Sequence, residues 1–145
     1  MSDVFVRDDQ MANVKFYVKA KKDIVKLVKP DQFSSLRASE REEYEECHVF
    51  LKPLTWGKSC HLQANAYTIH PMTNQRVFDP DKYVQMKLKA VISSWSFMVK
   101  NIKGEDIPVK VTEENIDALH PVVADFILKE YNERFEMSEE SRKNS

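Results

Sequence analysis

The spacing of apolar residues changes along this chain, and that change limits the folds it can adopt. Val14, Phe16 and Val18 occupy every second position, which is the period of a β-strand. From Leu54 onward, apolar residues recur at intervals of three and four, which is the period of an amphipathic helix. A strand pattern followed by a helical pattern predicts the α+β class.

We expect a mainly helical domain of three to four helices, preceded by a small antiparallel β-rich part. The predicted division is a β-rich N-terminal subdomain with an acidic linker over residues 1–46, a helical domain over 47–136 and a disordered tail over 137–145. The chain has 145 residues, of which 42% are hydrophobic, and this is enough apolar material for one core.

The β-rich part carries a local excess of lysine. Residues 14–29 contain six lysines and one aspartate, spread over a strand at 14–18 and a second β-rich run at 24–28 that Pro30 ends. One interpretation is a sheet whose solvated lysine face protects its edges from pairing. The other is a phosphate-binding face. The acidic segment 39–46 is placed to fold back against these lysines.

Capping residues mark where the predicted helices begin. Thr55 caps a helix over 56–67, and Asp79 followed by Pro80 starts a helix that either extends up to residue 99 or stops within 92–97, where serine and aromatic residues are weak helix formers. The other predicted segments are a loop over 70–78, a tight turn or small hairpin around Gly104, a short helix after Thr112 and a last helix over 121–135.

Few residues point to catalysis. The chain has two glycines, so glycine-rich phosphate loops cannot form. Cys47-His48 and Cys60-His61 are pairs of neighbours whose side chains point in different directions, so neither supplies two ligands to one zinc ion. No group is recognisable that would orient a cysteine nucleophile. We therefore expect no catalytic residue, no metal and no cofactor. The net charge of −1 argues against nucleic acid as a partner.

Aromatic and apolar residues crowd one short segment of the helical part. Trp95, Phe97 and Met98 follow one another so closely that a single face cannot bury all three. Either a partner covers this apolar surface, or the hairpin around Gly104 covers it within the chain. For Trp56, which lies on a helical stripe, we expect packing in the core, and for Trp95 likewise.

Several segments resemble one protein family in their order and spacing. They are Leu51-Lys52-Pro53-Leu54-Thr55-Trp56-Gly57, Phe78-Asp79-Pro80-Asp81-Lys82-Tyr83, Val91-Ile92-Ser93-Ser94-Trp95, Ile107-Pro108-Val109 and the run from Val111 to Ala124. Together they are similar to the tail assembly chaperones of long-tailed bacteriophages and to related small phage tail proteins. The resemblance covers about residues 50–132, and the first 45 residues lie outside it.

The resemblance implies a non-enzymatic protein that acts during virion assembly in the cytoplasm of the bacterial host. Such chaperones bind and solubilise the tape measure protein, a long helix with apolar stripes, and help to recruit tail tube subunits. The residues expected to contact partners are Trp95, Phe97 and Met98, with Phe126 and Tyr131 as further candidates.

A homo-oligomer is also expected. The basic face of residues 82–89 in one copy would join the acidic segment 112–145 of the next, which holds nine acids and four bases. The alternative function is a structural virion component of the tail, neck or baseplate. A third reading is a regulator that binds nucleic acid through the lysine face. We expect no membrane partner, because no apolar run is long enough to span a bilayer and the first residues lack a signal-peptide pattern.

Overall fold

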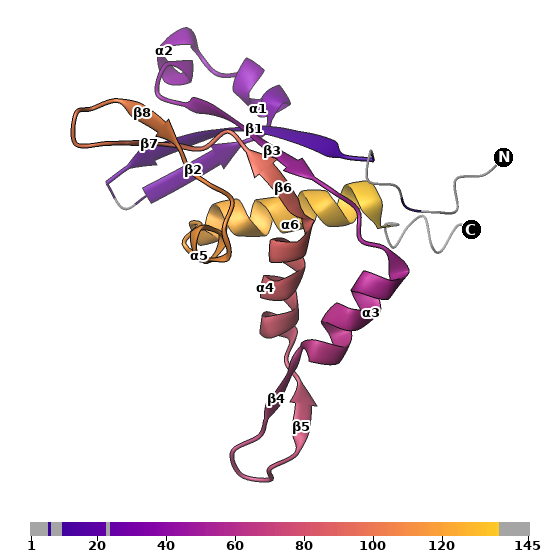
Figure 1. Cartoon of the computed structure of the whole chain (residues 1–145). Coiled ribbons are helices and arrows are strands. Elements are labelled where there is room, and N and C mark those ends of the chain that lie inside the picture. Colours follow the sequence, from indigo (N-terminus) through magenta and orange to yellow (C-terminus); the bar gives the residue numbers. More distant parts are fainter. Residues whose placement is uncertain (1–5, 7–9, 23, 137–145) are drawn as a thin grey trace, which may run out of the picture.

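A four-stranded antiparallel sheet forms the centre of the molecule (Figure 1). The computed structural model describes residues 6, 10–22 and 24–136, so the predicted tail at 137–145 lies outside the described residues. The strand order is β2–β1–β3–β6. The strands of this sheet are β1 (Ala12–Lys21), β2 (Ile24–Val28), β3 (Glu45–Leu51) and β6 (Ile92–Trp95).

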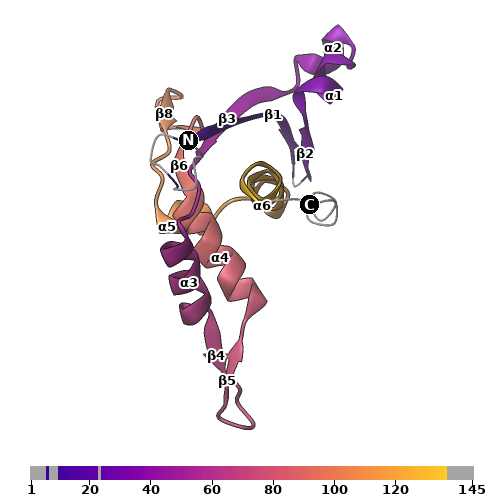
Figure 2. The ribbon, with the colours of Figure 1, turned by 90° about the vertical axis from the view of Figure 1, so that its right-hand side faces the viewer.

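One long helix covers the inner face of this sheet. Figure 2 shows α6 (Pro121–Phe135) end-on beneath the curved strands. Phe16 from β1, Leu51 from β3 and Ile127 from α6 are completely buried in the resulting core. The alternation predicted for residues 14–18 is present, because Val14 and Phe16 face this core.

Two short helices follow β2 on the other face of the sheet. They are α1 (Pro30–Ser34) and α2 (Ala38–Arg41). Phe33 of α1 stacks on Tyr17 of β1 with the ring centroids 3.7 Å apart. This contact buries Tyr17, although it lies on the face away from α6.

An arm extends away from the sheet, and Figure 1 shows that it ends in a hairpin turn. Its elements are α3 (Trp56–Asn65), β4 (Tyr67–Ile69), β5 (Arg76–Phe78) and α4 (Pro80–Val91). We call residues 56–91 the arm, and the rest of the described chain the body. The predicted caps at both arm helices are confirmed, since Thr55 accepts a hydrogen bond from the Lys58 amide and Asp79 accepts from the amides of Asp81 and Lys82.

A second small hairpin and a short helix connect the sheet to α6. They are β7 (Met98–Lys100), β8 (Asp106–Pro108) and α5 (Glu113–Asp117). The turn predicted at Gly104 is confirmed, and this glycine has φ of 80°, a left-handed conformation that other residues adopt at a cost. Thr112 caps α5 as expected.

The prediction of a mainly helical domain is wrong. Helices take about 40% and strands about 30% of the described residues. Of the two lengths predicted for the helix after Asp79, the longer is wrong, because the helix ends at Val91 and Ile92–Trp95 pair with β3 instead. Serine, isoleucine and tryptophan are weak helix formers, whereas pairing with β3 buries Ile92. The central sheet therefore takes strands from both sides of residue 46.

Two local predictions in the arm are also wrong. The side chain of Trp56 is 84% exposed, because the side of α3 that meets α4 carries Leu62. The segment predicted as a loop at 70–78 contains β5, which pairs with β4. Trp95, the other tryptophan expected in the core, is half-buried and packs against it.

Candidate functional site

Trp95 and Phe97 hold the β7–β8 hairpin against the core of the body. The Trp95 indole Nε1 donates a hydrogen bond to the Val109 carbonyl oxygen over 2.6 Å. The rings of Trp95 and Phe97 are 5.1 Å apart, and Phe97 meets Phe16 edge-on at 6.3 Å. Both predicted partner-binding side chains are half-buried and use much of their surface within the chain.

Phe126 and Tyr131 lie on α6 and face the core. The Phe126 ring is 5.1 Å from that of Phe16. Tyr131 is 2% exposed, and its hydroxyl accepts a hydrogen bond from the Leu54 amide over 3.0 Å. Burial raises the pKa of this phenol. Tyr131 therefore anchors the start of the arm to α6 and contributes no docking surface in this conformation.

Met98 is the exposed member of the predicted set, with 58% of its surface accessible. It begins the hairpin formed by residues 98–108, which we call the Met98 hairpin. Its turn is held by polar contacts, including the ion pair of Lys100 with Asp106 at 3.1 Å. Further exposed apolar side chains on this hairpin are Val99, Ile102 and Ile107.

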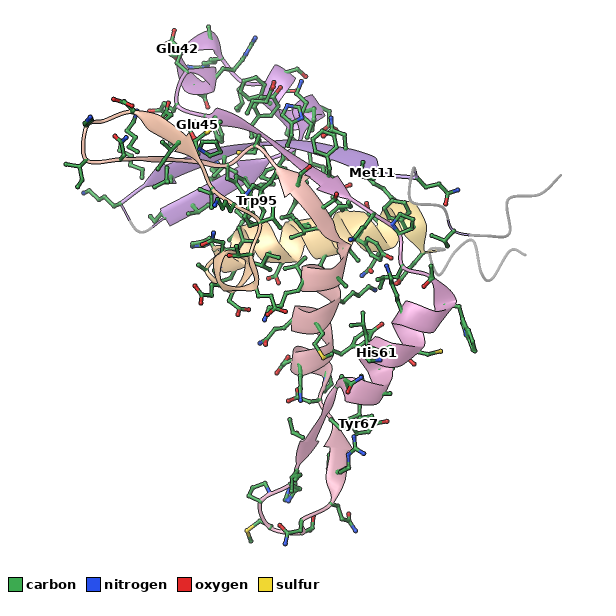
Figure 3. All side chains as sticks on the ribbon, in the orientation of Figure 1. Met11, Glu42, Glu45, His61, Tyr67 and Trp95 are labelled. Atoms are coloured by element: carbon green, nitrogen blue, oxygen red, sulfur yellow. The ribbon has the colours of Figure 1, made fainter. Side chains whose placement is uncertain are left out.

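The end of the arm presents a second exposed apolar surface. We call residues 67–78 the arm hairpin, and Figure 3 places Tyr67 at its base, far from Trp95 in the body. Arg76 lies over the Tyr67 ring at 5.2 Å. The exposed apolar side chains here are Tyr67, Ile69, Met72, Val77 and Phe78.

The sequence reasoning missed the arm hairpin as a site. A signal was present, because β-branched and aromatic residues at 67–69 and 76–78 flank a turn that contains Pro71 and Asn74. Asn74 has φ of 57°, which asparagine tolerates better than most residues. Proline and asparagine favour a loop, and the flanking runs of three residues are too short for their alternation to predict paired strands.

An apolar cleft of about 270 Å³ opens between the sheet and the junction of α5 with α6. We call it the inner cleft. Its apolar walls are Val18 and Val25 from the strands, Leu119 and Val123 from the helices, and Cys47 with Phe97 between them. Burial, with the nearby carboxylates of Glu45 and Glu46, raises the pKa of the Cys47 thiol to about 11. At neutral pH this sulfur is therefore a protonated wall atom rather than a nucleophile.

The two Cys-His pairs lie on different elements. Cys47 is buried in β3, whereas Cys60 is exposed on α3. His48 points away from Cys47, with its ring nitrogens bonded to Asn13 and Glu46. Within residues 6, 10–22 and 24–136, no three His, Cys, Asp or Glu side chains are placed to hold a metal ion.

The acidic segment folds back against the lysine face, as predicted. Lys15 pairs with Glu46 at 3.2 Å, and Lys19 pairs with Glu43 at 2.7 Å. Hydrogen bonds from Lys19 to Glu43, and from His48 and Lys15 to Glu46, lower the pKa of each carboxyl. These contacts are exposed and add little to stability, but they cancel part of the positive charge that a phosphate-binding face would use.

The predicted basic face at residues 82–89 is occupied inside the chain. Each of its three lysines has a partner on another segment. Lys82 Nζ donates to the Tyr67 carbonyl at 3.1 Å, Lys87 Nζ donates to the Asn132 amide oxygen at 2.9 Å, and Lys89 Nζ lies 3.1 Å from the Asp117 carboxylate. An association that used these lysines would have to break the internal contacts first.

No protein-family model matches this chain, and no curated protein or solved structure is similar to it. In the part of the chain that the structure describes, no helix combines the length and the apolar character needed to cross a membrane. The surfaces themselves are therefore the basis for a functional assignment.

Proposed function

We propose that this protein is a tail assembly chaperone of a long-tailed bacteriophage, which binds the tape measure protein and helps to recruit tail tube subunits. The observation that carries the proposal is the concentration of exposed apolar side chains on the Met98 hairpin and the arm hairpin, at different ends of the molecule (Figure 1). The sequence resemblance over residues 50–132 supports the choice of family.

Exposed apolar groups of this kind favour a role in binding other chains. Contiguous apolar surface on a monomer usually marks an interaction site. A tape measure helix has apolar stripes that would aggregate in water, and covering them removes apolar area from solvent at about 25 cal/mol per Å². Met98, Ile102 and Ile107 supply side chains for such a contact.

The two hairpins suit two partners. The Met98 hairpin is fixed to the body through Trp95 and Phe97, so it offers a firmly placed surface for the tape measure protein. The arm hairpin stands away from the body, which leaves it accessible to a tail tube subunit while the first surface is occupied. One molecule would then bring both components together.

Co-expression with the tape measure protein of the same genome tests the proposal. We expect this chain to raise the soluble fraction of the tape measure protein and to co-purify with it. The M98S/I102S/I107S variant should lose both effects. The I69S/M72S/V77S variant should keep them and lose capture of tail tube subunits. Met11→Ser is the matched control, since Met11 is exposed and lies outside both hairpins.

A tape measure protein that stays insoluble and unbound in the presence of the wild-type chain would refute this function. Purified particles provide a second check, because a chaperone leaves before the particle is complete. Recovery of this chain as a stoichiometric part of finished virions would favour the structural tail, neck or baseplate component instead.

A further inference from the structure

The central sheet ends at β2, which has a neighbouring strand on one side. β2 is last in the order β2–β1–β3–β6, and among the described residues it pairs with β1 alone. Figure 2 shows it at the outer end of the curved sheet. Backbone groups on the other side of such a strand can pair with another extended chain. We call this side of residues 24–28 the β2 edge.

Hydrogen bonding between β3 and β6 sets the direction of the backbone groups across the sheet. In antiparallel strands, successive residues direct their amide and carbonyl to opposite neighbours. The Ser96 amide donates to the His48 carbonyl over 2.9 Å, so the backbone of His48 points to β6. The backbone groups of Cys47 therefore point to β1, and those of its partner Phe16 point to β3. The residues between these in β1 bond to β2.

The same alternation leaves two residues of β2 with outward backbone groups. Tyr17 bonds to its partner Val28, so the amides and carbonyls of Val25 and Leu27 point out of the β2 edge. Lys29 is next in this series, but its amide and carbonyl both form hydrogen bonds within the first turn of α1. The chain therefore satisfies Lys29 itself and leaves the groups of Val25 and Leu27 to water or to a partner.

The two faces of the sheet differ in chemistry at this edge. On the inner face, Val25 lines the inner cleft and Leu27 packs against the core. On the outer face, Lys21 and Lys26 line an open depression together with the exposed Ile24. A strand added to the β2 edge would therefore present alternate side chains to an apolar surface and to a basic surface.

The lysines beside the edge determine which strand fits it. Lys19 pairs with Glu43 at 2.7 Å, whereas Lys21 and Lys26 form no ion pair among the described residues. Asp23, in the adjoining turn, lies outside those residues. Two copies paired edge to edge would set lysines against lysines, and like charges oppose such pairing. The same lysines favour a strand that carries acidic side chains.

We propose that the β2 edge binds an extended acidic segment of another protein by β-strand addition. Main-chain hydrogen bonds to Val25 and Leu27 hold the added strand. Its apolar side chains lie beside Val25, at the border of the inner cleft, and its carboxylates lie beside Lys26 on the opposite face. The edge therefore selects an alternation of acidic and apolar residues. This site is separate from the two hairpins and does not rest on the chaperone role.

A fluorescein-labelled octapeptide in which glutamate and valine alternate tests the proposal by fluorescence anisotropy. We expect the wild type to bind it at low salt, and less tightly as salt screens the charges. A peptide with lysine in place of glutamate should bind about tenfold more weakly, since attractive pairs become repulsive. A peptide of four glutamates followed by four valines should also bind more weakly, because it cannot match both faces.

Methylated forms of the alternating peptide separate strand addition from simple charge attraction. A strand bonds to its neighbour through alternate amides, so N-methylation of one alternate set should abolish binding. N-methylation of the other set should leave binding nearly unchanged. Equal binding of the two methylated peptides would show that charge alone holds them, and would overturn the proposal.

Substitutions in the protein test the same contacts from the other side. K21E/K26E should lose the glutamate peptide and gain the lysine peptide, because the charge at the edge is reversed. V25P removes an amide that faces the edge and should weaken both contacts without removing a bond to β1. K58E/R76E makes the same charge change on the arm and should bind like the wild type. Circular dichroism and the melting temperature check that each variant is folded.

Three results would count against the site. A wild type that does not bind the alternating peptide overturns the proposal, and so does a K21E/K26E variant that binds it as tightly as the wild type. A single-stranded oligonucleotide that binds the wild type more tightly than the peptide also overturns it, because the lysines would then serve nucleic acid. None of these outcomes decides the tape measure assay, which uses variants of the two hairpins.

Discussion

The body and the arm hairpin hold their shape by different means. In the body, Phe16, Leu51 and Ile127 are fully buried between the sheet and α6. In the arm hairpin, all six strand residues are exposed. The hairpin relies instead on a short β ladder and on ring contacts such as that of Tyr67 with Phe78, whereas the arm helices that carry it bury Leu62, Leu88 and Val91.

This contrast shows that the two regions use their apolar residues for different purposes. Burial of large apolar side chains is the main favourable term in folding, and the body uses its apolar side chains in that way. The arm hairpin leaves Ile69 and Met72 in water, where they do little for the stability of the isolated chain. Apolar groups buried in the body thus serve folding, whereas those exposed on the arm hairpin and on the Met98 hairpin are free to serve binding.

Removing a core side chain should produce the largest effect. We expect Phe16→Ala to lower the free energy of unfolding by about 3–5 kcal/mol, the usual cost of deleting a buried phenylalanine, because it also removes contacts with Phe97 and Phe126. Ile69→Ala in the arm hairpin should change it by less than about 0.5 kcal/mol. Urea unfolding measures both, and equal losses would show that the two regions do not differ in this way.

The reactivity of the two cysteine thiols provides a chemical test of the difference in burial between the body and the arm. Cys47 in the body is buried with a pKa of about 11, whereas Cys60 in the arm is exposed. A thiol reagent at neutral pH should label the exposed Cys60 much faster than Cys47, because Cys47 is shielded from the reagent and its raised pKa leaves almost none of the reactive thiolate. Cys60→Ser should remove the fast phase alone. Two thiols that react at similar rates in the folded protein would contradict the burial of Cys47.

Lys87 tests the junction between arm and body. It is 6% exposed on α4 and bonds to Asn132 and Glu136 at the end of α6. Lys87→Ala should cost about 1.5–3 kcal/mol of unfolding free energy, the range for hydrogen bonds to a charged group. Lys58→Ala, at an exposed arm position, is the control and should be nearly neutral. A Lys87 variant as stable as the control would mean that this junction adds nothing.

The smallest expected effect concerns a cap within the arm. Asp79 accepts hydrogen bonds from the amides of Asp81 and Lys82 at the start of α4. Asp79→Ala should cost about 1 kcal/mol, and Asp79→Asn should restore most of it. Hydrogen exchange should become faster at the first turn of α4 while the strands of the body keep their protection. Faster exchange throughout the body would show that arm and body unfold as one unit.

The candidate surfaces were only partly predictable from the sequence. Met98 was correctly singled out as apolar surface, because three large side chains in four residues cannot share one face. Tyr131 lies on an apolar helix face, and the sequence does not show whether such a face meets a partner or the core; in the structure it meets the core. The arm hairpin was missed because its strands are three residues long, too short for periodicity to separate them from a loop.

The sequence alone determined the features that depend on neighbouring residues. Capping by Thr55, Asp79 and Thr112 is a contact between a side chain and amides two or three residues away, and the Gly104 turn needs one residue with positive φ. Tertiary structure decided the rest. Residues 92–95 became a strand because β3, more than 40 residues earlier, offers an open edge and a buried place for Ile92. Such gains come from residues distant in sequence, so no local pattern contains them.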